Sequence, residues 1–478
     1  MYNTCNIDPC QSIQQSENIN GVKKLFWIMD FESEREWLDT RFDELWPITR
    51  SITGAGFRES LEVLQQDIPL EVESVSSGTE VFDWEIPPEW KIHEAKLTGP
   101  DGEVYADLDE TNLAIVNYSE PVDQRLTLDE LDSHLYTLPD QPEATPYVTS
   151  YYERNWGFCL PHNVYESLPE GEYHAYINSE LDDEGRLNYG HTILEGESDR
   201  EVLLSTYLCH PSLANNELSG PLVMASLYNR IAAWDNRKFT YRFVVIPETI
   251  GSLTYLCEYG NHLQENMVAG LVLTCLGGTE QTLSYKKTRR GDTLIDQLAQ
   301  HIDEYTDLDF RFRDFNPKGS DERQYCSPGF NLPVGQFART VYGEYDEYHN
   351  SLDNKSFLRI SNLVESAEII ENVLNKLEYA GYYLNQKPYG EPMMSKRDLY
   401  PTMNEPDRTR GDLTRQMMRI LNYSDGYHSV VDIAEEFNMS IEEFELAVET
   451  LTESDLLEPF EFTPKIDNSV FDLDGGNK

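Results

Sequence analysis

The second half of the chain alternates short apolar runs with longer amphipathic segments, and this alternation restricts the fold more than any other feature. The apolar runs are residues 201–208, 241–246, 270–276 and 332–338. The segments that repeat apolar side chains at the helical spacing are residues 218–234, 292–305 and 363–384. Apolar strands that alternate with helices form a mainly parallel sheet. We therefore expect an α/β fold in which helices cover both faces of the sheet.

Residues 81–145 have a different pattern, that of a small β-rich domain inserted in the α/β domain. Short segments of alternating polarity, such as 91–98 and 112–118, lie on either side of a turn at Pro100-Asp101-Gly102. Short strands separated by turn residues are typical of a β domain. The larger α/β domain is then expected to comprise residues 31–80 and 146–385.

The two ends of the chain predict a flexible start and a winged helix. Residues 1–30 are expected to form a flexible lead-in before a helix near 33–45, where Ser33 and Glu36 have the spacing of a capping box. After a proline-containing link come three helical segments and one apolar strand, at residues 413–422, 429–437, 440–454 and 456–462. This order indicates a winged-helix module at 400–463, followed by an acidic tail at 464–478.

The balance of charges argues against two classes of partner. The chain carries 86 Asp and Glu against 37 Lys and Arg, a formal net charge of −49. A surface this negative repels phosphate backbones and anionic lipids, so we expect neither nucleic acid nor a membrane as a partner. Hydrophobic residues still make up 39% of the chain, enough for a packed core. Because concentrated salt screens the self-repulsion of a carboxylate-rich surface with only 14 lysines, we infer a halophilic source.

The winged helix is subject to the same electrostatic argument. Its shape is ordinarily associated with DNA binding. Residues 401–478, however, hold 18 acidic and 6 basic residues, a net charge of 6 − 18 = −12. The third helix begins Ser-Ile-Glu-Glu-Phe-Glu at 440–445, and phosphates repel a helix of this charge. We therefore expect the module to pack against its own chain or against a protein.

The sequence shows no feature of an exported or membrane protein. The first 20 residues lack the basic and apolar regions of a signal peptide, and no apolar run approaches the roughly 18–20 residues of a membrane helix. The seven cysteines have no spacing typical of a disulfide framework or a CxxC metal site, so most are expected to be reduced. These features predict a cytoplasmic protein and leave its oligomeric state open.

Polar clusters follow the predicted strands, at the positions where ligands bind in parallel sheets. They lie at residues 206–220, 247–252, 318–329 and 345–354. Together they supply two histidines, His210 and His349, with several carboxylates and hydroxyls. A hydrolytic metal site needs such nitrogen and oxygen ligands, and a carboxylate that accepts the proton of a water molecule.

Each of these residues also has a simpler structural explanation. A single histidine in a loop is more often a hydrogen-bonding group than a ligand. Glu248 is suited to the start of a helix, where the helix dipole favours a carboxylate, and Asp321 with Glu322 is suited to a solvated turn. The interpretation as a site therefore depends on the coincidence of these residues at strand ends.

Strings in and around these clusters resemble those of the bacterial and archaeal aminopeptidase-like family, which is related to the zinc-dependent exopeptidases of peptidase clan MH. They are His-Pro-Ser-Leu-Ala-Asn at 210–215, Leu-Ser-Gly at 218–220, Pro-Glu-Thr-Ile-Gly-Ser at 247–252, Gly-Ser-Asp-Glu-Arg-Gln-Tyr-Cys-Ser-Pro-Gly at 319–329 and Tyr-His-Asn-Ser-Leu-Asp at 348–353. The likeness continues upstream through Trp-Pro-Ile-Thr-Arg-Ser-Ile-Thr-Gly at 46–54 and downstream into the winged helix. It covers roughly residues 40–460.

The resemblance implies a three-layer α/β/α aminopeptidase-like domain, an inserted small β domain and a C-terminal winged helix. It also implies zinc-dependent hydrolysis of a peptide or other amide bond in a small substrate, in a family often found among polysaccharide-biosynthesis proteins. The implied ligands of one zinc ion are His349 and Glu248 with one of His210, Asp321 and Glu217. Glu248 would act as general base, and Tyr325 or Arg323 would stabilise the oxyanion.

Three positions depart from the family pattern. Tyr207 stands in place of the first histidine of His-x-Cys-His-Pro-Ser, Asn216 in place of a metal-bridging aspartate, and Ala114 in place of a histidine in the β insert. A neutral amide is a poor substitute for a carboxylate that faces Zn²⁺, so we do not expect two metals. The alternative is a catalytically degenerate relative that keeps the fold as a ligand-binding or scaffold protein. Its pocket carboxylates would then bind an amine or an amino sugar.

Overall fold

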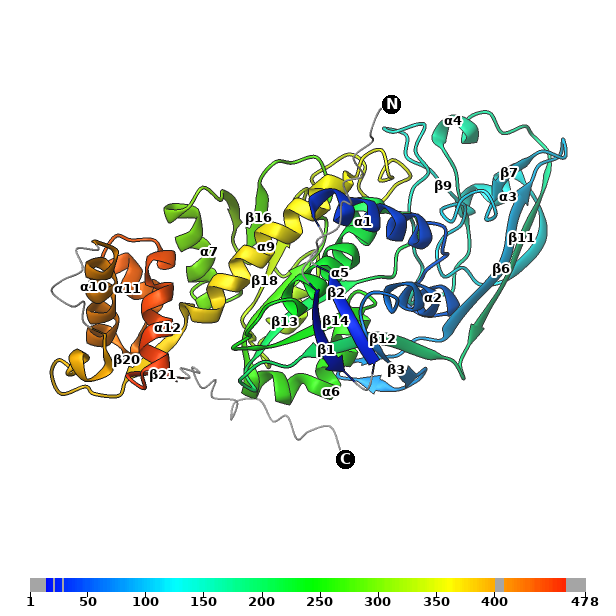
Figure 1. The fold of residues 1–478 in the computed structure, drawn as a ribbon. Helices are drawn as coiled ribbons and strands as arrows, with labels where there is room; N and C mark the ends of the chain where they lie inside the picture. The colour runs from blue at the N-terminus through cyan, green and yellow to red at the C-terminus, as the bar shows by residue number, and fades with distance from the viewer. Residues whose placement is uncertain (1–13, 20–21, 28–29, 400–407, 461–478) are drawn as a thin grey trace, which may run out of the picture.

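An eight-stranded mixed sheet lies in the middle of the protein, as the computed structural model shows for residues 14–19, 22–27, 30–399 and 408–460 (Figure 1). Its strands lie in the order β17 (Phe310–Arg313), β16 (Leu283–Lys286), β18 (Val334–Ala338), β15 (Met267–Leu273), β13 (Glu201–Tyr207), β14 (Thr240–Ile246), β12 (Arg186–Leu194) and β3 (Glu71–Ser76). The central strands β18, β15, β13 and β14 are parallel, whereas β12 and β3 pair antiparallel at one edge. The expected α/β fold is confirmed.

Side chains of the central strands alternate between two hydrophobic cores, one on each face of the sheet. Val202 and Leu204 of β13 belong to the first core, and Leu203 belongs to the second, because successive side chains of a strand point to opposite faces. The first core includes side chains of α1 (Phe31–Leu45), α2 (Ala55–Leu64), α5 (Ser219–Ala232), α7 (Leu294–Tyr305) and α9 (Ile360–Ala380). The second includes those of α6 (Ile250–Asn266) and α8 (Glu322–Tyr325). The three layers implied by the resemblance are therefore present.

The first helix begins earlier than the capping-box pattern predicts. Asp30 is the N-cap of α1, and its carboxylate accepts the backbone N–H of Ser33 at 2.9 Å. Aspartate caps as well as serine does, and the earlier start adds a turn that carries Glu34. Glu34 accepts a hydrogen bond from Arg230 Nε of α5 at 3.0 Å, so the added turn connects two helices.

A second, four-stranded sheet lies at one end of the molecule (Figure 1). Its strands lie in the order β7 (Val104–Asp107), β6 (Glu89–Thr98), β11 (Glu172–Asp182) and β8 (Val122–Thr127). Shorter elements around it are β4 (Glu80–Val81), β5 (Trp84–Glu85), α3 (Leu128–Leu131), η1 (Asp132–His134), β9 (Leu135–Tyr136), β10 (Phe158–Cys159) and α4 (His162–Tyr165). The strand β11 lies beyond residue 145, where the sequence placed the end of the insert.

Residues 112–118 do not form the short strand that their alternation predicts. They form turns with isolated bridges, in which Ile115 pairs with Phe158 and Asn117 with Thr149. Partners from separate loops take up the hydrogen bonds of this segment, so no continuous ladder forms. The turn at residues 100–102 joins β6 to β7 as expected, with Gly102 at φ +84°.

The C-terminal winged helix lies at the far end of α9 from the four-stranded sheet (Figure 1). Its elements are β19 (Tyr382–Asn385), α10 (Arg408–Tyr423), β20 (Asp425–Ser429), α11 (Val430–Glu436), η4 (Ile441–Phe444), α12 (Glu445–Glu453) and β21 (Leu457–Phe460). The short helix η3 (Met394–Arg397) lies between β19 and α10. The three strands form a sheet in the order β20-β19-β21. Each predicted helix and the predicted wing strand has a counterpart here.

The winged helix packs against its own chain, which is one of the two expected arrangements. Ile420, Ile433 and Leu451 belong to the same hydrophobic core as the residues of α9. The backbone N–H of Ile441 donates to His301 Nε2 of α7 at 3.0 Å. Glu442 also lies 2.6 Å from Lys376 Nζ of α9, so apolar and polar contacts hold the module in place.

At the N-terminus, where the sequence predicted a flexible lead-in, β1 (Gln14–Ile19) and β2 (Val22–Trp27) pair as an antiparallel hairpin. Residues 1–13, 20–21 and 28–29 lie outside the described part of the chain, as does the acidic tail predicted at 464–478. None of the helices that the structure describes is long and apolar enough to cross a membrane.

Candidate functional site

The carboxyl ends of β13 and β14 bring two of the predicted polar clusters together. Tyr207, the last residue of β13, is paired in register with Ile246, the last residue of β14. The next residue, Leu208, donates its backbone N–H to the Ile246 carbonyl at 2.9 Å. The side chains that follow the two strands, including His210 and Glu248, therefore share one edge of the sheet.

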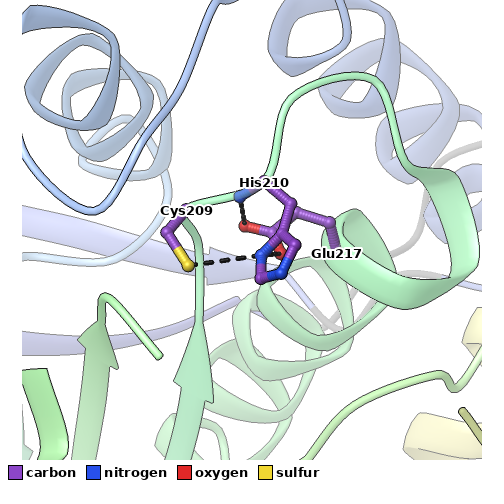
Figure 2. Close-up of side chains that lie close together, drawn as sticks. All are labelled: Cys209, His210 and Glu217. Carbon is purple, nitrogen blue, oxygen red and sulfur yellow. Dashed lines mark hydrogen bonds and ion pairs between the residues drawn. The ribbon is translucent and has the colours of Figure 1, made fainter. Parts of the chain in front are cut away.

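His210 and Glu217 form a buried pair in the loop after β13 (Figure 2). Glu217 accepts the backbone N–H of His210 at 2.7 Å through Oε1, and its Oε2 lies 2.8 Å from His210 Nδ1. The Cys209 Sγ atom lies 3.2 Å from the same nitrogen. His210 is 4% exposed and Glu217 is 1% exposed, so water does not compete for these contacts.

The surrounding acids determine the charge of this pair. Burial by itself lowers the pKa of His210, but Glu217 and Glu248 together raise the pKa of His210 above its ordinary value. Burial raises the pKa of the Cys209 thiol well above its ordinary range, so without a cation beside it this cysteine is protonated. Cys209 and Glu217 also contact the same ring nitrogen, whereas a Cys–His–Glu nucleophile needs them at opposite nitrogens.

Glu248 lies on the other side of the His210 ring. Its Oε2 is 3.8 Å from His210 Nε2, and its side chain is 26% exposed, so the carboxyl faces both the pair and the opening. Burial raises the pKa of Glu248 to about 8, against the attraction of the neighbouring His210. A carboxyl with such a pKa exchanges a proton near neutral pH, as a general acid or base must.

The Gly-Ser-Asp-Glu-Arg string fixes the turn that carries Glu248. Asp321 Oδ1 accepts the Thr249 N–H at 2.8 Å and the Ser252 hydroxyl at 2.8 Å. Arg323 Nη2 donates to Thr249 Oγ1 at 2.8 Å. Asp321 is 1% exposed, its Oδ2 has no hydrogen-bond partner among the described residues, and burial raises the pKa of Asp321 to about 6.

His349 lies close to His210. The two ring centroids are 5.5 Å apart and form a triangle with the Tyr147 ring, whose centroid is 4.9 Å from His210 and 5.3 Å from His349. The His349 ring stacks on Tyr348 at 3.9 Å. Burial, followed by the charge of His210, lowers the pKa of His349 to about 3, so its ring is neutral and free to accept.

Tyr207 and Asn216, two of the departures from the family pattern, contact each other. Asn216 Nδ2 donates to the Tyr207 hydroxyl at 3.0 Å. The Tyr207 hydroxyl lies 2.6 Å from Thr274 Oγ1, which in turn donates to the Asn216 carbonyl at 3.4 Å. These three residues form a ring of hydrogen bonds, and Asn216 Oδ1 is left without a partner among the described residues.

Two residues outside the loop hold its backbone. Asp353 accepts the N–H groups of Asn215 at 2.7 Å and Asn216 at 2.9 Å, at the π-turn η2 (Ala214–Leu218) that leads into α5. Arg50, which is 0% exposed, donates through Nε to the His210 carbonyl at 3.2 Å. Just after the turn, a Cβ on Gly220 would lie 2.2 Å from Thr206 Oγ1, so only glycine lets α5 start this close to the sheet.

Backbone strain gathers around the pocket. Four of the ten described non-glycine residues with positive φ lie in its loops: Ser212 at +48°, Thr249 at +66°, Cys275 at +54° and His349 at +56°. This conformation costs a residue with a side chain about 1–2 kcal/mol. It persists where surrounding contacts over-determine it, which is common at functional sites.

The structure brings most of the predicted site residues together and leaves one apart. His210, Glu217, Glu248, Asp321, Arg323 and His349 all belong to loops around the pocket. Tyr325 does not: it is 0% exposed, and its hydroxyl is bonded to Ser205 of β13 at 2.9 Å. This geometry does not support the oxyanion role predicted for Tyr325, because its hydroxyl is packed against the sheet.

Sequence reasoning did not identify three residues that shape the site. Cys209 was not among the predicted ligands, although it precedes His210 directly. Arg50 and Asp353 lie inside strings that resemble the family, and that membership was the signal available for both. Their contacts with the loop after β13 connect positions far apart in the chain, which spacing alone cannot reveal.

Comparison with known proteins identifies the family. Residues 40–380 match the family model described as "Domain of unknown function (DUF4910)", and residues 381–459 match a winged helix-turn-helix model. The chain is 40% identical over 415 residues to a Clostridium acetobutylicum protein named for polysaccharide biosynthesis and an aminopeptidase-like domain, covering 87% of this chain and 94% of that protein. The chain belongs to this aminopeptidase-like family.

Solved structures support the same fold for this member of the aminopeptidase-like family. A crystal structure from Clostridium acetobutylicum, described as that of a peptidase, matches with 38% identity and a TM-score of 0.78, covering 90% of this chain and 98% of that one. A zinc aminopeptidase from Bacillus subtilis matches with 10% identity and a TM-score of 0.54, covering 73% and 95%. At this identity the second likeness concerns the fold alone.

Proposed function

We propose that the protein is a zinc-dependent, aminopeptidase-like hydrolase that holds one metal ion and acts on a peptide or other amide bond. The observation that carries the proposal is the buried cluster of Cys209, His210 and Glu217, whose ligand atoms all lie within 4.8 Å of one another. Glu248 faces this cluster from the side of the opening. Family membership and the fold of zinc aminopeptidases support it.

The chemistry of these side chains fits one zinc ion and does not fit two. Thiolate, imidazole and carboxylate are the three ligand types that zinc prefers, and all three side chains are buried. The charge of a bound cation would favour the deprotonated forms of Cys209 and His210. Among the described residues, a second zinc ion has no comparable set of ligands. Tyr207 and Asn216 present a phenol and a neutral amide that are bonded to each other.

The roles of the chain's own residues follow from their positions. When bound, zinc supplies a Lewis acid that polarises an amide carbonyl and lowers the pKa of a water molecule toward ~7. Glu248 would serve as the proton acceptor for a water molecule at this position and as the proton donor to the leaving amine. Asp321 and Arg323 hold the turn of Glu248 through Thr249, so they position the base. His349 lies across the pocket as a neutral acceptor or a further ligand.

Metal titration and matched variants test this proposal. We expect the purified protein to bind one equivalent of zinc, and Glu217→Gln to weaken zinc binding at least tenfold because it removes an anionic ligand. Glu443→Gln, at an exposed glutamate of the winged helix, is the matched control and should leave zinc binding unchanged. Glu248→Gln should keep the zinc and lose hydrolysis of amino-acid anilides. A parent protein that binds less than a few tenths of an equivalent would contradict the proposal.

A second candidate is a degenerate relative that binds a ligand without catalysis. The hydrogen bond between Tyr207 and Asn216 favours it, because a directly bonded pair stands where the family pattern has a histidine and a metal-bridging aspartate. If the replacement of the family's histidine and aspartate is what prevents zinc binding, the double variant Tyr207→His with Asn216→Asp should gain zinc binding that the parent lacks. A parent that already binds zinc tightly would exclude this candidate.

A further inference from the structure

We propose that the exposed rings of Trp84 and Tyr152 form a carbohydrate-binding subsite, which stacks on a pyranose ring whose hydroxyls are equatorial. The two rings come from segments outside the zinc cluster, the hairpin of β4 and β5 and the loop at residues 151–155. The inference rests on the proposed function in one respect: a sugar bound here would belong to the amide-containing substrate. The binding itself needs no zinc, so it is testable on the metal-free protein.

The hairpin of β4 and β5 holds aromatic side chains in the solvent. Val81 and Ile86 are buried in the second hydrophobic core and anchor the hairpin there. Between these anchors, Phe82 and Trp84 are 52% and 40% exposed. Phe82 also adopts φ +55°, a conformation that bulky residues avoid. Large apolar side chains that gather on a surface, as here, are typical of a binding site.

Trp84 and Tyr152 form an open corner of two ring faces. Their ring centroids are 5.2 Å apart, and the ring planes meet at 74°. Tyr152 is 52% exposed, so the contact between the rings leaves both open to a ligand. Among the described residues, neither Trp84 Nε1 nor the Tyr152 hydroxyl has a hydrogen-bond partner. Each ring therefore offers an apolar face together with a free polar group.

The loop that carries Tyr152 connects the corner to the candidate site. The preceding residue, Tyr151, shares a hydrogen bond of 2.5 Å with the Tyr147 hydroxyl. The Tyr147 ring lies 4.9 Å from that of His210. Burial, and after it nearby groups that include Glu248, raise the pKa of the Tyr151 phenol. A ligand on the corner is therefore next to the proposed reaction centre.

The charges beside the corner select among ligands that have an apolar face. The hairpin and the loop together carry four exposed carboxylates, Glu80, Asp83, Glu85 and Glu153, and one cation, Arg154, which lies 4.0 Å from Glu120. This balance repels phosphates and so disfavours nucleotides. Carboxylates accept hydrogen bonds from hydroxyl groups. A pyranose with equatorial hydroxyls has C–H groups on its face and hydroxyls at its edge, which matches an aromatic face bordered by acceptors.

Two other ligand types also bind aromatic rings, and the geometry disfavours both. The apolar side chain of a peptide gains most from a pocket that encloses it, whereas two open rings leave much of its surface in water. A quaternary ammonium binds in a cage of aromatic rings. The third exposed ring, that of Phe82, packs against Phe330 at 5.7 Å instead of closing such a cage. The pyranose fits the open corner best.

Fluorine NMR of the full chain, labelled with 5-fluorotryptophan and kept in excess chelator, tests the proposal. The chain has seven tryptophans, and Trp84→Phe assigns the Trp84 resonance as the one that it removes. We expect cellotriose or chitotriose to shift this resonance saturably, with a dissociation constant in the millimolar range. Sorbitol, which has hydroxyls without a ring face, should not shift it.

Three results overturn the inference. The first is that neither trisaccharide shifts the Trp84 resonance, and the second is that sorbitol shifts it as strongly. The third is that N-acetyl-leucinamide, a probe for an apolar side chain, or tetramethylammonium binds at Trp84 more tightly than both trisaccharides. A parent protein that does not bind zinc affects only the proposed function, because these titrations contain no metal.

Variants of the second ring show that the corner carries the binding. Tyr152→Ala removes one wall and should weaken trisaccharide binding about tenfold or more, and Trp84→Ala serves if that variant does not fold. Tyr389→Ala is the matched control, since it removes an exposed tyrosine ring between β19 and α10, and it should bind as the parent does. Tyr152→Phe keeps the ring and should stay within about threefold of the parent. Unchanged binding in Tyr152→Ala, or an equal loss in Tyr389→Ala, overturns the inference.

Discussion

Tyr207 and Asn216, two substitutions relative to the family pattern, are bonded to each other. The Asn216 amide donates to the Tyr207 phenol, and the phenol shares a second hydrogen bond with the Thr274 hydroxyl. An aspartate at 216 would present only acceptors and would reverse the direction of the first bond. This pairing means that either residue changed alone alters the hydrogen bonding of both, and the two are best tested together.

A buried ion pair near the candidate site allows a test of how much a single charged residue contributes to stability. Lys286 Nζ donates to Glu322 and to the Lys318 carbonyl, and the two charged side chains are 5% and 0% exposed. We expect Glu322→Ala to lower the free energy of unfolding by about 3–5 kcal/mol, because it leaves a buried ammonium without its counter-ion. Urea denaturation measures this loss.

The matched control for that pair is the double variant Lys286→Met with Glu322→Leu. It removes both charges and keeps the volume, so it should lose clearly less stability than Glu322→Ala. If the single and double variants unfold at the same urea concentration, the uncompensated charge is not what destabilises the protein.

Sequence reasoning identified the residues of the site better than their roles. His210 and Glu248 were predicted because they follow strands whose carboxyl ends share an edge, and that relation depends only on the fold. The burial of Tyr325 was not predictable, since it depends on which way a four-residue helix turns a side chain. The hydrogen bond from Arg50 to the His210 carbonyl was not predictable either, because it joins residues that are far apart in the chain.

At the scale of elements, periodicity predicted the four central parallel strands and the helices α5, α7 and α9 within a few residues, whereas the long helix α6 was not predicted. The strands β12 and β3 were missed for different reasons. The edge strand β3 is mostly exposed, and β12, although buried, mixes polar with apolar residues and so lacks a continuous apolar run. The expected strand at 112–118 failed for the opposite reason: its alternation is real, but separate loops bind its backbone.

The contact between α7 and the winged helix predicts a dependence of stability on pH. His301 Nε2 must be unprotonated to accept the N–H of Ile441, and burial lowers the pKa of His301 to about 4. The unfolded chain takes up this proton near pH 6.5, so the contribution is complete above pH 6.5 and is lost as the pH falls toward 4. We expect a loss of about 2 kcal/mol between pH 7.5 and 5, measured by urea unfolding.

His301→Gln is the control for this pH dependence, since glutamine also offers an acceptor and does not titrate. Among the described residues, Glu435 is the acid that lies within ion-pair distance of the ring, 3.7 Å from His301 Nδ1, so Glu435→Gln reports its influence. If the stability of the His301→Gln variant falls with pH as steeply as that of the parent, other groups cause the loss.

The winged helix also bears on the expectation about nucleic acid. Ala447, Val448 and Leu451 of α12 are buried, and the face that remains exposed carries Glu445 and Glu449. The helix that would enter a DNA groove therefore presents carboxylates. The absence of a nucleic-acid partner stays a prediction, in line with the electrostatics of this face.

For the whole molecule, the net charge of −49 predicts that salt stabilises the fold. Screening weakens the repulsion among surface carboxylates, which is greater in the compact state than in the unfolded chain. We expect the thermal unfolding midpoint to rise by about 5 °C or more between dilute buffer and 2 M KCl, which corresponds to roughly 5 kcal/mol for a chain of this size.

Circular dichroism during heating measures the two midpoints. Glycerol at equal osmolality is a suitable control, because it stabilises proteins without screening charge. Equal midpoints in dilute buffer and in molar KCl would contradict both the prediction and the halophilic source inferred from the sequence.

The attachment of Asp353 to the loop after β13 has a consequence for the synthesis of the protein. Asp353 holds the backbone of Asn215 from 138 positions further along the chain. While the ribosome is making the protein, the loop with His210 and Glu217 is therefore present long before the residue that fixes its shape. A nascent chain arrested before Asp353 emerges can contain most of the sheet and still lack the final shape of this loop. The ability of the loop to bind a ligand therefore arises late in translation, in one step, rather than growing with chain length.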